Sequence, residues 1–331
     1  EIVDAALIVL ETEPLGYTFN GGILELRELI AQRAPGNHTA DSVCVTVGAN
    51  GGLLGSMLVS VDAGDEVLVP NPGFPTYEAI TSLAGAHPVC YPMSADDSFR
   101  FSVDALEKLI TKKTRAVVIN SPSNPTGHII PDSELKGLAT LADAHDLMVI
   151  SDEVYHEFYY GERCPSFLDV SGRGLVVNSL SKTEAMTGWR IGWTVGPPEF
   201  ISAITAVNQH SVTCAPTLSQ RVALRTLDAS AEERAAGIRA DFAQRRRLML
   251  EMIDDQLGLP RIEPEGAFFV LLEAAPSGDS LELALDILDK TNVITIPGAA
   301  FGEESSRFLR LSFGATEACI FEGLQRLGGY F

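Results

Sequence analysis

The chain has 331 residues, of which 46% are hydrophobic and 21% are charged, and its formal net charge is -20. This length suffices for a large core and two domains, and so acidic a surface repels the phosphates of nucleic acids. No apolar run is long enough to span a bilayer, and no CxxC motif occurs among the five cysteines, Cys44, Cys90, Cys164, Cys214 and Cys319. We therefore expect a cytoplasmic protein with reduced thiols and with no nucleic-acid, membrane or metal partner.

Short strand-like runs alternate with helical patterns up to residue 195. The candidate strands are Val43–Val47, Glu66–Val69, His87–Tyr91, Arg115–Asn120, Leu147–Ser151, Leu175–Asn178 and Ile191–Val195. Helices lie between them, for example over Ser133–His145, where Pro131-Asp132 is typical of a helix start. This order predicts an α/β fold with a mostly parallel seven-stranded sheet covered by helices on both faces. The last strand follows Lys182 too closely for a full crossover helix, so we expect it to run antiparallel.

The C-terminal part has a different pattern. A charged helical pattern runs from Ser230 to Asp255, and we interpret its triplet Arg245-Arg246-Arg247 as a solvated face. Strand-like segments follow at Ala267–Leu272, Val293–Ile296 and Phe308–Phe313. We predict a large domain over residues 17–235 and a smaller α+β domain over 236–331, against which residues 1–16 pack.

Chemically useful side chains follow three of the predicted strands. Asn124 follows the fourth, Asp152 and Tyr155 follow the fifth, and Lys182 follows the sixth. Each has a structural explanation on its own, because Asn-Pro-Thr-Gly is a good turn, an Asp after a strand often caps a helix, and a corner lysine is usually solvated. Ligands of open α/β sheets, however, bind where strands end, so these side chains are expected to face one site.

Together these side chains suit a pyridine aldehyde. The Lys182 amine can form a Schiff base, and the Asp152 carboxylate can keep a ring nitrogen protonated. Tyr155 and Asn124 can donate hydrogen bonds to a phenolic oxygen. These are the requirements of a pyridoxal 5'-phosphate enzyme.

A phosphate group would need cations, hydroxyls and backbone N–H groups. Those available are the guanidinium of Arg190, the hydroxyls of Ser179 and Ser181, and a predicted helix start at Ala49-Asn50. The glycines near this helix start also resemble a dinucleotide fingerprint, but the acid expected at the end of the next strand is missing.

Phe74, in Pro72-Gly73-Phe74-Pro75, comes just after the end of the second predicted strand. Its ring can stack on a pyridine ring, and it can equally be an ordinary core residue.

These motifs, in this order, resemble the class I/II aminotransferases, which are fold type I pyridoxal-phosphate enzymes, over nearly the whole chain. The residues that carry the resemblance are Tyr17, Gly22, Glu25-Leu26-Arg27, Asn124-Pro125-Thr126-Gly127, Asp152-Glu153-Val154-Tyr155, Ser179 to Lys182, Arg190, Pro297-Gly298, Phe301-Gly302 and Arg310. The resemblance implies that the large domain binds the cofactor and that Lys182 carries it as a Schiff base. It further implies that Arg310 binds the substrate α-carboxylate, and that Tyr17 reaches the phosphate of a neighbouring subunit in a homodimer.

The implied reaction moves an amino group between an L-amino acid and a 2-oxo acid, with Lys182 as the general base. Alternatives are a lyase or synthase on the same scaffold, a non-catalytic pyridoxal-phosphate-binding module, and a nicotinamide enzyme. No Lys or Arg occurs from Ala34 to Phe99, so we expect neutral aliphatic or aromatic amino donors. Family members usually carry several tens of further residues before the point that corresponds to Glu1, so we expect that such a segment was removed, is disordered, or is naturally short.

Overall fold

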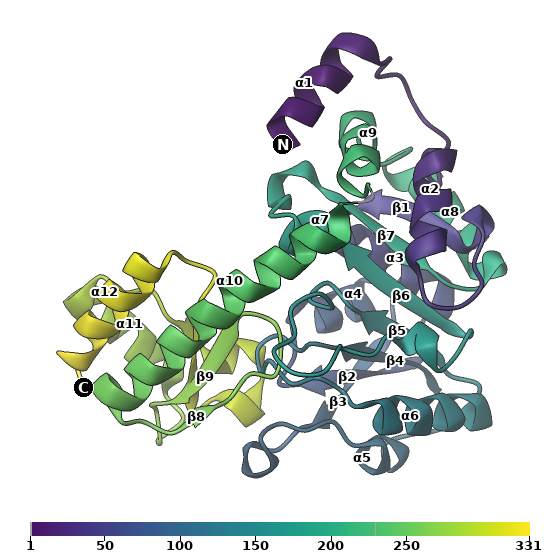
Figure 1. Ribbon diagram of the computed structural model, residues 1–331. Coiled ribbons are helices and arrows are strands. Elements are labelled where there is room, and N and C mark those ends of the chain that lie inside the picture. Colours follow the sequence, from purple (N-terminus) through teal and green to yellow (C-terminus); the bar gives the residue numbers. More distant parts are fainter. Residues whose placement is uncertain (1, 229) are drawn as a thin grey trace.

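The computed structural model describes residues 2–228 and 230–331, which form two sheets joined by a long helix (Figure 1). The larger sheet has seven strands in the order β1-β7-β6-β5-β4-β2-β3. Their bounds are β1 Val43–Val47, β2 Glu66–Asn71, β3 His87–Pro92, β4 Thr114–Asn120, β5 Met148–Asp152, β6 Gly174–Ser179 and β7 Ile191–Val195. Each predicted strand is present within two residues at either end.

All neighbouring strands of this sheet are parallel except at β7, which is antiparallel to both β1 and β6. The predicted antiparallel strand is therefore confirmed. The connection after β6 holds only the short α7 (Leu180–Thr183) and a 3₁₀ helix at Thr187–Trp189, which together are too short for a parallel return.

Helices cover both faces of the seven-stranded sheet, as predicted, because its strands are apolar on both sides. Val117 and Ile119 pack with α2 (Leu24–Arg33), α6 (Asp132–His145) and α9 (Thr217–Thr226). Val118 points to the other face, which α3 (Gly48–Ser60), α4 (Thr76–Leu83) and α8 (Pro198–Ser211) cover. The short α5 (Val103–Glu107) contacts β3 and α6. We call this sheet with its helices the large-sheet region.

The N-terminal helix α1 (Ile2–Thr12) corrects one prediction. It packs on α9 of the large-sheet region, where Glu13 lies 3.1 Å from Arg221 and 2.8 Å from Arg225. Its buried Ala6 and Val9 belong to the main core. The described part of residues 1–16 therefore does not pack against the C-terminal part, as Figure 1 also shows. The periodic spacing of apolar residues in a helix predicts which side of the helix is buried, but it does not predict which neighbouring element covers that side.

The second sheet is antiparallel, with the order β10-β11-β9-β8. Its strands are β8 Arg261–Ile262, β9 Phe269–Glu273, β10 Ile296–Pro297 and β11 Phe308–Ser312. Its helices are α11 Ser280–Thr291 and α12 Glu317–Gly328. The predicted strand at Val293–Ile296 is wrong for most of its length, since β10 begins only at Ile296. The two-residue β8 was not predicted, because so short a run has no readable period.

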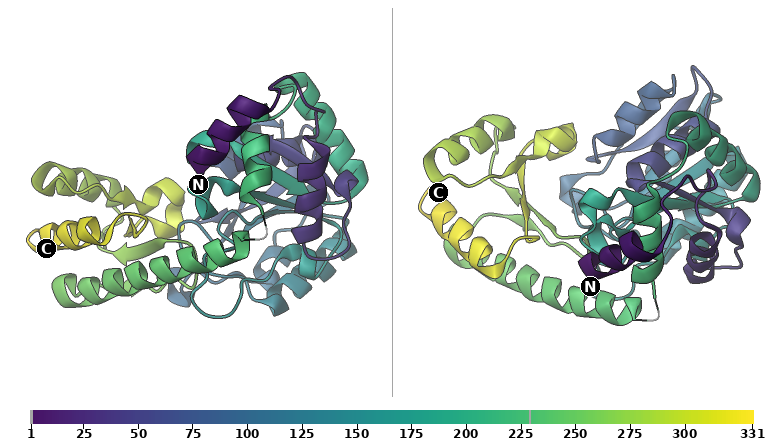
Figure 2. Two further views of the ribbon diagram at one scale, coloured as in Figure 1. Left: turned by 45° about the horizontal axis from the view of Figure 1, so that its top comes forward. Right: turned by 90° about the horizontal axis from the view of Figure 1, so that it is seen from above.

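The long helix α10 (Ala231–Met252) runs from the large-sheet region to this second sheet, and Figure 2 shows it extending between the two. Its last turns pack through Met249, Leu250 and Met252 into the core of the second sheet. We call the second sheet with α11 and α12 the small-sheet region. The domain boundary between residues 235 and 236 stays a prediction, and it falls inside α10. No helix in the described part of the chain is both long and apolar enough to cross a membrane.

Candidate active site between the two sheets

Three neighbouring strands of the larger sheet bring the predicted residues together. Asn120, at the end of β4, is paired with Asp152 at the end of β5, and Asp152 is paired in turn with Val177 of β6. Asn124 follows β4 by four residues, and its backbone N–H donates a 2.7 Å hydrogen bond to the Asn120 side chain. Lys182 lies in α7, directly after β6. The amide, the carboxylate and the amine therefore share one edge of the sheet.

Asp152 is a buried carboxylate with one strong side-chain donor. Its side chain is 3% exposed, and Oδ2 accepts a 2.8 Å hydrogen bond from the hydroxyl of Tyr77. Burial raises its pKa to about 6, against the lowering effect of the hydrogen bonds from Tyr77 and from the Val154 N–H. Tyr77, on α4, was not predicted as a site residue. Its position three residues after Phe74, on the helix that follows the end of β2, was the available signal.

Lys182 lies among aromatic rings. Its Nζ is 5.7 Å from the ring centre of Tyr155 and 5.9 Å from that of Phe268. Burial lowers its pKa, and the nearby charge of Arg310 lowers it further, while Asp152 opposes both. The lowered pKa favours the neutral amine, which is the form that attacks a carbonyl or accepts a proton. Phe268 was not predicted, because it approaches the sheet edge from the small-sheet region.

Arg310 comes to the same edge from β11 of the small-sheet region. Its Nη1 donates a 2.7 Å hydrogen bond to Oδ1 of Asn124. The guanidinium carbon lies 4.2 Å from the ring centre of Phe269 and 4.7 Å from that of Phe301, while Nε is buried and has no hydrogen-bond partner among the residues that the structure describes. The two rings and Asn124 hold the guanidinium in one orientation, so its other N–H groups are available to a carboxylate. The site therefore lies between the two sheets.

A second corner of the site surrounds the start of α3. Gly48 has φ +65°, and a Cβ added there would lie 2.6 Å from Nη2 of Arg190. Gly192 on β7 is as tightly placed, since its added Cβ would lie 2.8 Å from the backbone N of Ala49. Arg190 therefore lies directly against the first turn of α3, whose N–H groups face outward from the helix start.

The two serines flank this corner. Both are buried, and the Ser179 hydroxyl accepts a 3.3 Å hydrogen bond from the Ser181 N–H, so Ser179 caps α7. Asn50 is exposed in the first turn of α3.

Phe74 and Tyr17 lie further out. Phe74 packs edge-to-face against Tyr77, with ring centres 5.8 Å apart, so it contacts the residue that bonds Asp152. Tyr17 is 89% exposed and lines a separate cavity of about 360 Å³, together with Phe19 and Arg27. None of the other predicted site residues lines this cavity in the part of the chain that the structure describes.

Comparisons with known proteins identify relatives that match nearly the whole chain. A sequence profile described as "Aminotransferase class I and II" matches residues 5–327. The chain is 34% identical over 322 residues to "Aromatic-amino-acid aminotransferase 2" of Thermococcus litoralis, an alignment that covers 94% of this chain and 82% of the relative. It is 36% identical over 335 residues to "Valine--pyruvate aminotransferase" of Mycobacterium tuberculosis, which covers 98% and 86%. Among solved structures, an aromatic aminotransferase from Pyrococcus horikoshii superposes with a TM-score of 0.95 at 34% identity, covering 99% of this chain and 91% of the other.

Proposed function

Because the chain belongs to the class I and II aminotransferases and has their fold, we propose that it moves an amino group between an L-amino acid and a 2-oxo acid with the help of pyridoxal 5'-phosphate on Lys182. One observation carries the proposal. A partly buried amine, a buried carboxylate and an oriented guanidinium, those of Lys182, Asp152 and Arg310, meet at one sheet edge.

The residues present fit this cofactor. When bound, pyridoxal phosphate supplies an aldehyde for covalent attachment and a protonated ring that withdraws electrons from the substrate. The buried Asp152 carboxylate would be the partner of the ring nitrogen, because a charged N–H donor beside it would offset part of the cost of its burial. Tyr155 and Asn124 would hold the phenolic oxygen.

The phosphate would be held at the second corner of the site. Arg190, Ser179, Ser181 and the N–H groups of Ala49 and Asn50 provide the donors. The close approach of Arg190 to Gly48 supports this assignment, because it gathers cationic and backbone donors in one place. Phe74 would pack against the ring from the side of α4.

The side chains divide the chemical work. Arg310 binds the α-carboxylate of the amino acid and thereby orients its Cα–H bond. The Lys182 amine, whose pKa is lowered by burial and by its cationic neighbours, accepts the α-proton as a general base and later returns a proton as an acid. The ionised Asp152 carboxylate would keep the ring nitrogen of the bound cofactor protonated.

We propose neutral aliphatic or aromatic amino donors. The basic-free stretch Ala34–Phe99 supplies α3 and Phe74 to the site but no cation for a second carboxylate. Phe268 and Phe301 add apolar surface beside Lys182 and Arg310. The relatives bear the names of aromatic, valine and aspartate enzymes, so their names do not decide the matter.

We further propose a homodimer in which Tyr17 reaches the phosphate of the partner's site. Tyr17 and Phe19 are 89% and 58% exposed, and Val3, Leu7 and Leu10 on α1 are more than half exposed as well, so apolar surface is concentrated near the N-terminal end of the chain. Sedimentation of the purified protein tests the assembly. All five cysteines are free, which supports a location in the reducing cytoplasm.

A visible absorption spectrum recorded during an amino-donor screen tests the function. An aminotransferase given an amino acid alone should stop after one half-reaction, with a single shift of the cofactor absorbance that the corresponding 2-oxo acid reverses. Continuous release of product would instead indicate a lyase or synthase. A cofactor spectrum that no amino acid in the panel changes would favour a non-catalytic binding module, and no cofactor absorbance at all would overturn the proposal.

A further inference from the structure

The loop between β8 and β9 is one of the places where the small-sheet region meets loops of the large-sheet region. The N–H groups of Glu265 and Gly266 both donate to the carbonyl oxygen of Gly127, at 3.0 and 2.8 Å. The carbonyl oxygen of Glu265 accepts a 3.0 Å hydrogen bond from the Tyr160 N–H. The contact is tight, since a Cβ added to Gly127 would lie 2.5 Å from Pro264. Small changes in this loop are therefore transmitted across the junction.

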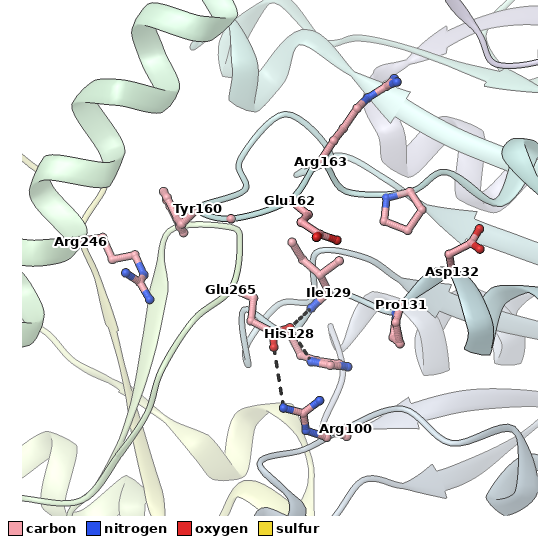
Figure 3. A pocket seen from close by; sticks show the side chains of 12 residues that line it. Arg100, His128, Ile129, Pro131, Asp132, Tyr160, Glu162, Arg163, Arg246 and Glu265 are labelled. Carbon is pink, nitrogen blue, oxygen red and sulfur yellow. Dashed lines mark hydrogen bonds and ion pairs between the residues drawn. The ribbon is translucent and has the colours of Figure 1, made fainter.

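The side chain of Glu265 adds three interactions across the same junction (Figure 3). Its Oε2 accepts hydrogen bonds from Nδ1 of His128 at 2.9 Å and from the Ile129 N–H at 3.0 Å. Its Oε1 lies 3.9 Å from Nη2 of Arg100. We call these contacts the Glu265 bridge. The His128 hydrogen bond, followed by that from Ile129, lowers the pKa of Glu265 to about 2, so the Glu265 carboxylate is ionised at neutral pH.

His128 gives the bridge a defined geometry. Its side chain is 7% exposed, and its Nε2 is buried and has no hydrogen-bond partner within residues 2–228 and 230–331. Glu265 is therefore the one hydrogen-bond partner that holds the imidazole ring in place among the described residues. Both His128 and Glu265 line a cavity of about 520 Å³ between the two regions. Arg246 of α10 lines the same cavity.

The two segments that the Glu265 bridge joins continue to Asn124 and Arg310, the residues expected to bind the substrate. On one side, Gly127 lies three residues after Asn124 in the same loop. On the other, Glu265 is followed by β9, whose Leu271 is the register partner of Arg310 on β11. Asn124 and Arg310 are themselves joined by their 2.7 Å hydrogen bond. We propose that Glu265 is a positioning residue that fixes Arg310 relative to Asn124, and thus sets the affinity for the substrate carboxylate. This inference rests on the proposed function only in the role that it gives Arg310.

The test compares two Glu→Gln variants of the same loop in the cofactor-loaded enzyme. E265Q removes the negative charge that faces His128, the Ile129 N–H and Arg100. E263Q is the matched control, because Glu263 is 60% exposed and pairs with Arg246 and Arg261 rather than with the loop that follows Asn124. Hydrogen exchange by mass spectrometry should show faster exchange in the peptides around Gly127 and Gly266 for E265Q but not for E263Q. Equal exchange in E265Q and the native protein, or the same acceleration in E263Q, would overturn the proposal.

Steady-state kinetics separates positioning from general destabilisation. For the amino acid that gives the fastest half-reaction in the native enzyme, E265Q should raise KM at least about threefold and change kcat by less than about twofold. H128F, which keeps a ring but has no donor for Glu265, should have a similar effect, and the double variant should be no worse than either single one. An unchanged KM, or additive effects in the double variant, would contradict the inference. If the native enzyme shows no half-reaction with any donor, the proposed function fails, whereas the exchange experiment still decides on the Glu265 bridge.

Discussion

The buried carboxylate of Asp152 should destabilise the cofactor-free protein in a pH-dependent way. Its pKa in the folded chain is about 6, compared with the ordinary value of 3.8, so the proton is held more tightly in the folded state. The stability that this provides is complete below about pH 3.8 and is lost as the pH rises through about 6. The two pKa values correspond to a loss of about 3 kcal/mol near pH 8 and about 1 kcal/mol near pH 4.5.

Asp152→Asn isolates this effect, because an amide of similar shape does not ionise. The Tyr77 hydroxyl can still donate to the amide oxygen, whereas the Val154 N–H loses its acceptor if the NH₂ group faces it. That second cost does not depend on pH. Urea unfolding of the apoprotein should therefore show that D152N, compared with the native sequence, has a free energy of unfolding about 2 kcal/mol larger near pH 8 than near pH 4.5, which means that it is relatively more stable at high pH.

Tyr77→Phe provides a check in the opposite direction. The Tyr77 hydroxyl lowers the pKa of Asp152, so its removal should raise this pKa further and enlarge the loss of stability at high pH. The reasoning would be refuted if the difference between D152N and the native protein were the same at both pH values. It would also be refuted if Y77F reduced the pH dependence.

Three further predictions concern substrate binding, phosphate binding and the pKa of the Lys182 amine. Arg310→Lys should lower kcat/KM for the amino donor at least about tenfold while the cofactor spectrum is kept, because an ammonium cannot replace the fork that Asn124 orients; a loss of the spectrum instead would assign Arg310 to cofactor binding. Gly48→Ala should weaken cofactor retention, measured by dialysis and absorbance, because its methyl would lie 2.6 Å from Arg190 at φ +65°. Gly188→Ala is the control, since it has no heavy atom within 4 Å of its added Cβ, and equal cofactor loss in both variants would contradict the assignment. R310Q should raise the pKa of the Lys182 amine in the apoprotein, because it removes a neighbouring cation, and amine-labelling rates against pH would show an unchanged midpoint if the reasoning were wrong.

The large sheet could be predicted from the sequence because its strands are short apolar runs that end in polar side chains. Such runs end at or within four residues of Asn124, Asp152 and Lys182. Parallel strands must bring their carboxyl ends to one edge of the sheet. Chain order alone therefore places these three side chains together. The same holds for the antiparallel β7, whose connection is too short for any other arrangement.

What the sequence does not reveal depends on packing between distant segments. Tyr77 reaches Asp152 across 75 residues of chain, and Phe268 approaches Lys182 from the other sheet. The Glu265 bridge joins segments 136 residues apart at Ile129. The position of α1 on α9 belongs to the same class, because apolar periodicity identifies the buried side of a helix but not what covers it.

The most direct test of the account is to locate the covalent bond to the cofactor. Borohydride reduction of the enzyme loaded with pyridoxal 5'-phosphate, followed by digestion and mass spectrometry, should find the phosphopyridoxyl group on the peptide that contains Lys182. The Lys182→Ala variant should carry no such group and should lose the visible absorbance of the bound cofactor. Labelling of another lysine in the native enzyme, or an unchanged visible spectrum in the variant, would contradict the assignment of Lys182 and the mechanism built on it.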